Sequence, residues 1–166
     1  MPEDLFIDIV DENDSVIGRI KEEEALSMPD KRTRAISIFL FNSKRELLLQ
    51  RRSKNKIRYP LHWDCSASGF VNSGEDYETT AVRELKEELG VIKKTSELEF
   101  ILKRVVETDR TEFVKLYKLE YDGPIKVNDN EVESGKFFSI NEIKEMIDSG
   151  EKLSPFFVIL FNSVYK

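Results

Sequence analysis

The spacing of hydrophobic positions changes along the chain. In several stretches they alternate with polar residues or form short runs rich in Val, Ile and Phe, and such runs between polar turns are typical of β-strands. This spacing predicts strands over residues 5–10, 16–17, 33–41, 46–50, 63–71, 98–106, 112–121 and 132–138. A hairpin is expected at residues 42–45, and residues 21–26 fit a helical turn that ends before Pro29.

Between residues 76 and 89 the spacing becomes helical. One apolar stripe recurs at intervals of three or four residues, formed by Ala81, Val82, Leu85 and Leu89. Asp76 is suited to the N-cap position, and Gly90 stands where a glycine commonly ends a helix. We therefore expect an amphipathic helix that packs through this stripe.

Two further helices are expected near the C-terminus. One opens at Ser139 or Asn141 and ends at Gly150. Ser154 followed by Pro155 has the form of an N-cap with proline in the first helical turn, so it opens a last helix. The apolar residues of this last helix fit either the core or the face of a homodimer.

The mixture of hairpins, crossovers and helices indicates an α+β or layered α/β/α domain. The chain has 166 residues and a mass of 19.4 kDa, and its 40% hydrophobic residues are enough for a core. It has neither repeats nor a long linker, so residues 1–166 are expected to form a single domain.

Charge and cysteine content exclude several classes of protein. The net charge of −6 makes nucleic-acid binding through bulk charge unlikely. With one cysteine, Cys65, and one histidine, His62, neither a disulfide framework nor a Cys/His zinc site is expected. The longest apolar run, residues 156–161, is too short to cross a membrane, and residues 1–4 do not resemble a signal peptide. These features predict a cytoplasmic protein.

Three acids on the central helix suggest chemistry. Glu84, Glu87 and Glu88 fall within about 100° of arc, beside the apolar stripe. Like charges at this spacing repel one another, whereas a divalent cation bound between them would make the interaction favourable. Mg²⁺ prefers carboxylate oxygens as ligands. Taken alone, the same string also fits an ordinary solvated helix.

The glycine spacing around this helix resembles the Nudix box. Gly69 is followed after five residues by Glu75, and after seven more by the string Arg-Glu-Leu-Lys-Glu-Glu-Leu-Gly-Val over residues 83–91. A chance match to so many fixed positions is negligible. The resemblance implies an α/β/α sandwich with a mixed sheet and metal-dependent hydrolysis of a nucleoside diphosphate linked to another moiety.

The resemblance also implies roles for single residues. Glu84 and Glu88 match the principal ligands of Mg²⁺ or Mn²⁺, with Glu87 as a further ligand or bridge and the Gly69 carbonyl often joining the shell. Glu75 and Arg83 match the ion pair that orients the helix.

The identity of the general base stays open. Members of the family use a glutamate of the helix or one of a distal loop, so Glu84 and Glu87 on the helix and Glu131 and Glu133 before Phe137 are the candidates. The two loop acids equally fit an ordinary solvated loop.

The N-terminal half is similar to the branch of the superfamily that contains isopentenyl-diphosphate isomerase. The shared stretches are residues 6–11, 33–35, 48–53 and 63–64. Two departures disfavour isomerase activity: Thr33 stands where the branch usually has histidine, and Ser68 occupies the position of the catalytic cysteine. Glu112 is a weak match to a strand glutamate of the isomerase. The Nudix box here is intact, so a hydrolase on this branch fits better.

Basic and aromatic residues supply candidates for substrate binding. The dense basic stretch contains Arg51, Arg52, Lys54, Lys56 and Arg58. Alternation along a strand sends Arg51 and Arg52 to opposite faces, so at most one of them faces a cleft that binds a small-molecule diphosphate.

Phe70 is the main candidate to stack on an aromatic group of the substrate, with Tyr59, Trp63 and Phe138 as others that equally fit the core. Sugar nucleotides, dinucleoside polyphosphates, nucleoside phosphates and isoprenoid or inositol diphosphates all fit this pattern. A nucleotide-binding regulator without turnover is the alternative from another class, and RNA-end hydrolysis is disfavoured by the acidic balance.

Overall fold

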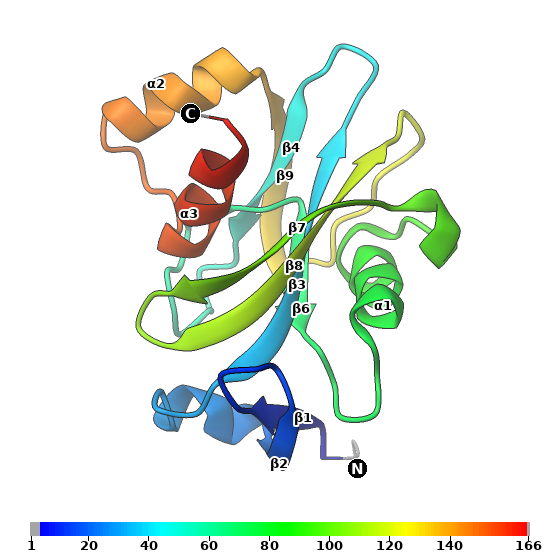
Figure 1. The fold of residues 1–166 in the computed structure, drawn as a ribbon. Helices are drawn as coiled ribbons and strands as arrows, with labels where there is room; N and C mark the ends of the chain where they lie inside the picture. Colours follow the sequence, from blue (N-terminus) through cyan, green and yellow to red (C-terminus); the bar gives the residue numbers. More distant parts are fainter. Residues whose placement is uncertain (1–3, 166) are drawn as a thin grey trace.

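A mixed seven-stranded β-sheet forms the centre of the structure, a computed structural model that describes residues 4–165 (Figure 1). The strands of this sheet are β3 Thr33–Phe41, β4 Leu47–Arg52, β5 Trp63–Asp64, β6 Ala67–Phe70, β7 Glu99–Glu107, β8 Thr111–Glu120 and β9 Val132–Phe138. A separate hairpin and two short 3₁₀ helices are formed by β1 Phe6–Val10, β2 Val16–Lys21, η1 Glu22–Ser27 and η2 Thr95–Glu97. The helices are α1 Tyr77–Leu89, α2 Ile140–Asp148 and α3 Pro155–Val164.

Strand β3 is the central strand. The main path of the sheet is β5-β4-β3-β8-β7, with β6 paired to β3 and β9 paired to β4. Strands β3 and β8 are parallel, while the other pairs are antiparallel. Seven consecutive buried residues, from Ala35 to Phe41, let β3 contact apolar layers on both faces of the sheet.

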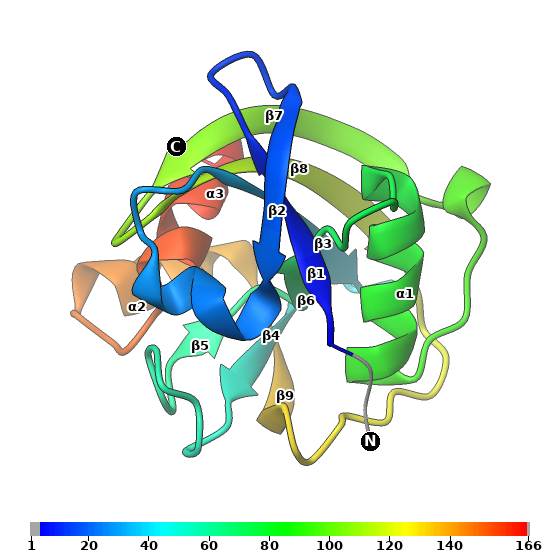
Figure 2. The same ribbon diagram turned by 90° about the horizontal axis from the view of Figure 1, so that it is seen from below.

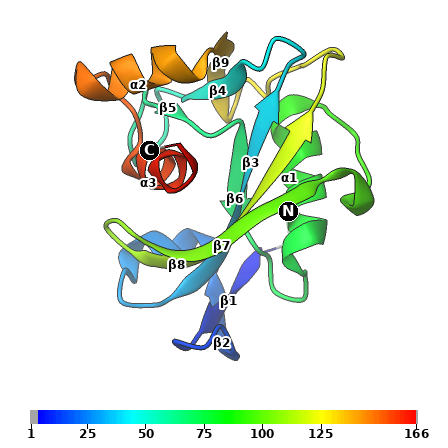
Figure 3. The ribbon, with the colours of Figure 1, turned by 45° about the horizontal axis from the view of Figure 1, so that its top comes forward.

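Helices cover both faces of the sheet (Figure 3). On β3, Ile36, Ile38 and Leu40 belong to the apolar cluster that includes α1. Ala35 and Phe39, on the opposite face, belong to the cluster that includes α2 and α3. The predicted α/β/α sandwich with a mixed sheet is therefore confirmed.

The helix ends follow local sequence signals. The Asp76 carboxylate accepts a hydrogen bond of 2.7 Å from the Thr79 N–H, and Gly90 ends α1 with φ of 66°. Ser139, rather than Asn141, caps α2, because its hydroxyl accepts from the Glu142 N–H at 3.1 Å. At the start of α3, the Ser154 hydroxyl accepts from the Phe157 N–H. These three caps satisfy backbone donors that the first turns leave free.

The last helix is a core helix. Phe157, Leu160 and Phe161 are fully buried against the sheet. The apolar residues of this helix were expected to form either part of the core or the face of a homodimer, and these three pack into the core.

The prediction of one extended strand over residues 63–71 is wrong. The segment divides into β5, which pairs with β4, and β6, which pairs with β3. Between them, the Ser66 hydroxyl accepts from the Leu40 N–H at 2.8 Å and donates to the Leu48 carbonyl at 2.6 Å. A buried side chain thus takes the place of ladder hydrogen bonds where β3 and β4 diverge. The return strand predicted at residues 16–17 is also longer, reaching Lys21.

One carboxylate at the turn of the β1–β2 hairpin contacts three other elements; Figure 2 looks onto this hairpin from below. Asp14 accepts hydrogen bonds from Arg34 Nε at 2.6 Å, Tyr77 Oη at 2.8 Å and Lys103 Nζ at 2.5 Å. Burial acts to raise the pKa of Asp14, but these three donors outweigh it and hold the pKa below its usual value. Asp14 therefore connects the hairpin to β3, α1 and β7.

We expect Asp14→Asn to lower the free energy of unfolding at pH 7 by about 1–3 kcal/mol, because three donors lose a charged acceptor. Urea unfolding measures this change. The pKa of Asp14 is depressed in the folded state, so its ionised carboxylate stabilises the fold at pH values above the unfolded pKa. The difference in free energy of unfolding between the wild type and Asp14→Asn should therefore narrow as the pH falls from about 4. Glu12→Gln, an exposed acid in the same turn, is the control. Equal losses in both variants would contradict this account.

Candidate active site

One cleft of about 440 Å³ brings together most of the candidate residues. One wall is formed by α1 and β6 and contributes Ser68, Gly69, Phe70, Arg83, Glu84, Glu87 and Glu88. The other is formed by the end of β4, the loop after it and the β7–β8 turn, and contributes Arg52, Lys56, Arg58, Tyr59 and Arg110. The cleft therefore has an acidic wall on α1 and an opposite wall, called here the basic wall, whose cations are paired with acids.

Gly69 allows Glu84 to lie against the backbone of β6. A Cβ atom at position 69 would lie 2.2 Å from Glu84 Oε1, closer than any side chain tolerates. Any larger residue at position 69 would force the Glu84 carboxylate to move from this place, away from its hydrogen bond to Arg83. The predicted role of the Gly69 carbonyl as a ligand stays a prediction.

Glu88 is buried and held by two donors. Gln50 Nε2 donates to its Oε2 at 2.5 Å, and the Ser68 N–H donates to its Oε1 at 3.1 Å. Only 7% of Glu88 is exposed. Sequence reasoning did not identify Gln50, although a polar residue directly after the run Leu47–Leu49 was a signal of a buried polar contact.

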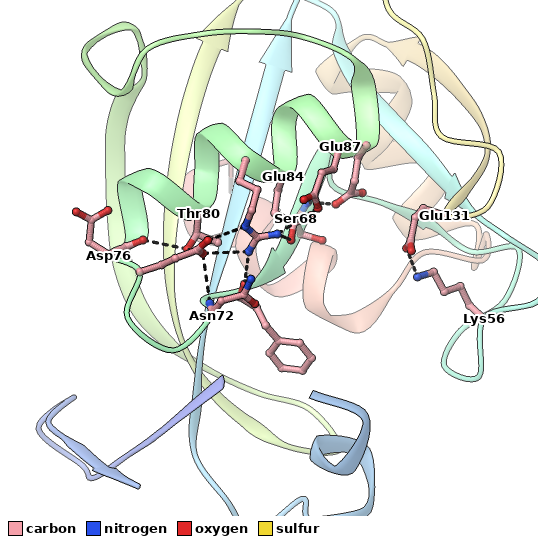
Figure 4. A network of polar contacts seen from close by, with 12 residues as sticks. Lys56, Ser68, Asn72, Asp76, Thr80, Glu84, Glu87 and Glu131 are labelled. Carbon is pink, nitrogen blue, oxygen red and sulfur yellow. Dashed lines mark hydrogen bonds and ion pairs between the residues drawn. The ribbon is translucent and has the colours of Figure 1, made fainter. Parts of the chain in front are cut away.

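Arg83 contacts three acids at once (Figure 4). Its Nε and Nη2 donate to Glu75 at 2.9 and 3.1 Å, which forms the ion pair expected from the family resemblance. Its Nη1 donates to Glu84 at 2.9 Å and to Glu87 at 3.1 Å, and Nη2 also donates to the Phe70 carbonyl. The guanidinium thus links the loop before α1 to the acidic face of the helix.

Burial shifts the ionisation of the helix acids. Removal from water raises the pKa of Glu84 to about 7, against the attraction of Arg83 and with the repulsion of Glu87. Burial and the neighbouring Glu84 carboxylate raise the pKa of Glu88 well above its usual value. Two adjacent buried carboxylates that resist ionising together favour a shared cation.

The residues present fit a hard divalent cation. Glu84 and Glu88 offer carboxylate oxygens, the donors that Mg²⁺ and Mn²⁺ prefer, and an added cation would offset their like charge. Within residues 4–165, no three His, Cys, Asp or Glu side chains are already grouped around a point that a metal ion would take. The Arg83 guanidinium instead bridges Glu84 and Glu87.

On the basic wall, the structure separates two neighbouring arginines. Arg52 lines the cleft, where its Nη1 lies 3.3 Å from Asp64 Oδ2. Arg51 is outside the lining, since its Nε donates to the Leu61 carbonyl and its guanidinium lies over the Trp63 ring. Only one of the pair faces the cleft, as the alternation requires, and the proposal of Arg51 as a substrate-binding residue is withdrawn.

The aromatic candidates also divide. Phe70 and Tyr59 line the cleft. Trp63 and Phe138 pack edge to face, with ring centroids 5.2 Å apart, in the cluster that contains α3. Phe70 therefore stays a candidate to contact substrate, whereas Trp63 and Phe138 serve the core.

Glu131 lines the cleft, and its carboxylate pairs with Lys56 from the opposite loop (Figure 4). Glu133 is exposed on β9 and lies outside the lining. Of the two loop acids proposed as general base, Glu131 alone is placed in the cleft.

Arg110, in the β7–β8 turn, and Phe156, in the first turn of α3, line the cleft but were missed from the sequence. Glu112, the weak match to the strand glutamate of the isomerase, also lines the cleft, from the start of β8. Glu112 is the register partner of Thr33 on β3. An acid at the start of an apolar strand was the available signal for Glu112, whereas the turn arginine had none.

Comparison with known proteins agrees with an α/β/α domain that carries a cleft with an acidic helix. The NUDIX domain profile matches residues 31–157. The chain belongs to the Nudix hydrolase superfamily. It is 32% identical to an uncharacterized Nudix hydrolase of Nostoc sp. over 99% of both chains. It is also 30% identical to isopentenyl-diphosphate Delta-isomerase 1 of Photorhabdus laumondii, over 90% of this chain and 88% of the isomerase.

A solved structure supports the same fold. The crystal structure of DR0079 from Deinococcus radiodurans matches with a TM-score of 0.83 and 29% identity, over 97% of this chain and 99% of that one. Among the described residues, no helix is long and apolar enough to cross a membrane.

We expect the metal-free protein to lose about 1–3 kcal/mol of stability as the pH rises from about 5 to 8. The folded pKa of Glu84 is raised to about 7, so folding favours the protonated acid and its contribution is lost as the pH rises through that value. Urea unfolding in metal-free buffer measures the slope. Glu84→Gln should flatten it, whereas Glu99→Gln, an exposed acid on β7, should keep it. An unchanged slope in Glu84→Gln would count against the burial argument.

Proposed function

We propose that the protein is a Mg²⁺- or Mn²⁺-dependent hydrolase that cleaves a phosphoanhydride bond in a nucleoside diphosphate linked to another moiety, or in a related nucleotide. The observation that carries the proposal is the pair of buried Glu88 and largely buried Glu84, placed beside Gly69 in a cleft whose other wall carries arginines and a lysine. Such a cleft accommodates a diphosphate together with its cation. A cytoplasmic location stays a prediction.

Each residue has a role that follows from its place. Glu84 and Glu88 would hold the divalent cation, with Glu87 and the Gly69 carbonyl as further donors. When bound, this cation neutralises charge on the phosphoryl oxygens and lowers the pKa of a coordinated water. Arg52 would bind phosphate oxygens from the opposite wall, and Phe70 would pack against the substrate.

The proton of the attacking water needs an acceptor, and three acids are candidates. Glu84 and Glu87 lie on the acidic wall, and Glu131 lies in the loop before β9. Glu131 is paired with Lys56, so a phosphate that drew Lys56 away would leave this carboxylate available as a base. The arrangement supports Glu131 as a base that acts once substrate is in the cleft.

Isomerase activity is the alternative that the Photorhabdus relative raises. Cys65 is fully buried, and burial raises the pKa of its thiol well above the usual value. Ser68, a poorer nucleophile and acid than a thiol, lines the cleft instead. A binding protein without turnover is disfavoured because the acids Glu84, Glu87 and Glu88 are all present in the cleft.

We expect Glu84→Gln and Glu88→Gln each to lower kcat by about 10²-fold or more, because each removes a charged donor for the cation. The assay offers sugar nucleotides, dinucleoside polyphosphates, nucleoside phosphates and isopentenyl diphosphate, and identifies products by mass spectrometry. EDTA should abolish turnover, and Glu99→Gln should retain it. Tight binding of one compound without cleavage of any would favour the regulator, and isomerised isopentenyl diphosphate would favour the isomerase.

For the substrate found in that assay, we expect Arg52→Ala to raise KM by about tenfold and Arg51→Ala to leave it unchanged, because only Arg52 faces the cleft. Steady-state kinetics measures both variants, and circular dichroism checks that each is folded. A larger effect from Arg51 than from Arg52 would show that the basic wall is assigned to the wrong face of β4.

A further inference from the structure

One buried cation in the cleft has a donor without an acceptor. Arg110 lies in the turn between β7 and β8, and its side chain is only 14% exposed. Its Nε donates to Glu112 Oε1 at 2.6 Å. Among the described residues, Arg110 Nη1 is buried and has no hydrogen-bond partner. Leaving a charged donor unpaired away from water is costly, so this atom indicates a missing acceptor.

The guanidinium of Arg110 is held in place. Its Cζ lies 4.3 Å from the centre of the Phe70 ring, a distance at which a cation is attracted to the ring face. Glu112, which fixes the other side, is buried within β8. Because the Phe70 ring and the Glu112 carboxylate hold the planar guanidinium of Arg110 in place, it is pre-organised to bind a second anion, such as a carboxylate or a phosphate.

Two guanidinium groups, those of Arg110 and Arg58, line the cleft here, and each is paired with one acid. Burial lowers the pKa of Arg110, and the neighbouring Arg58 lowers it further against the attraction of Glu112. Arg58 also lines the cleft, and its own acid partner is Asp109 at the outer side of the turn. An anion at this place would accept a charge-assisted hydrogen bond from Arg110 Nη1 and be attracted by the Arg58 guanidinium, whereas an apolar group would leave Nη1 unpaired.

We infer that Arg110 binds a phosphate group of the substrate at a subsite on the β8 side of the cleft, distinct from the acidic wall of α1. This inference rests on the proposed function and deepens it, because it assigns the substrate an anionic group at Arg110 as well as one at the acids of α1. Substrates with a run of phosphates, or with a second phosphate on the linked moiety, fit such a cleft. A linked moiety that offers no acceptor at this position does not.

The subsite is tested by the binding of inorganic pyrophosphate in buffer freed of metal over a chelating resin, measured by isothermal titration calorimetry. Without a cation the acids of α1 repel the ligand, so the basic wall supplies the binding. We expect Arg110→Ala to weaken binding at least tenfold. Arg104→Ala, which removes an exposed arginine of β7 outside the cleft lining, should leave it unchanged. Equal affinity in Arg110→Ala and wild type would overturn the inference.

A variant that should strengthen pyrophosphate binding distinguishes a binding role of Arg110 from a merely structural one. Glu112→Gln keeps an acceptor for Arg110 but removes the competing charge, so pyrophosphate should bind several-fold more tightly. Arg110→Gln, which keeps a planar group on Phe70, replaces Arg110→Ala if the latter fails to fold. If Arg110 only braces Phe70 and Glu112, these variants will change the melting temperature and leave the affinity as it was, which would also overturn the inference.

Failure of the proposed hydrolase function can be distinguished from failure of the Arg110 subsite. Glu88→Gln should not weaken metal-free pyrophosphate binding, because it acts on the acidic wall. Pyrophosphate binding that depends on Arg110, in a protein without turnover, would uphold the subsite and reject the hydrolase. Turnover that depends on Glu88, with pyrophosphate binding indifferent to Arg110, would do the reverse.

Discussion

The placement of two neighbouring carboxylates where little of either is exposed to water is the constraint on which the rest of the site depends. Glu84 and Glu88 are one helical turn apart, and α1 presses both against β6. Such a pair is unfavourable unless something supplies positive charge or hydrogen bonds. Arg83, Gln50 and the Ser68 N–H supply part of it. The remaining unfavourable charge is what a divalent cation would remove, so the proposed cation would gain affinity from the repulsion between these two carboxylates.

The two walls of the cleft are constructed differently. The acids stand on a capped helix packed against the central strand, where backbone geometry fixes their spacing. The cations stand largely on loops, which are joined to neighbouring loops by the ion pairs Lys56–Glu131 and Arg58–Asp109. A site that positions a metal needs rigid support, whereas a site that accepts substrates of different shape gains from adjustable support. The division agrees with a common reaction and a variable substrate.

The features that were predicted correctly have local causes. The caps of α1 and α3, the strand β3 and the placement of the Nudix-box acids on one helix are each determined by residues close together in the chain. The errors and omissions have distant causes. The division of residues 63–71 depends on Ser66 reaching Leu40 and Leu48, and Glu88 is held by Gln50, which lies 38 residues away in the sequence. Arg110 enters the cleft only because β7 and β8 form a hairpin beside β3.

The most direct test of the central claim is to locate a bound cation. Crystals of the protein soaked with Mn²⁺ would be measured for anomalous scattering from manganese. The account predicts a peak between the carboxylates of Glu84 and Glu88 and the carbonyl of Gly69, and no peak there in crystals of Glu88→Gln. Manganese found elsewhere, with Glu84 still bound to Arg83 and Glu88 to Gln50, would contradict it.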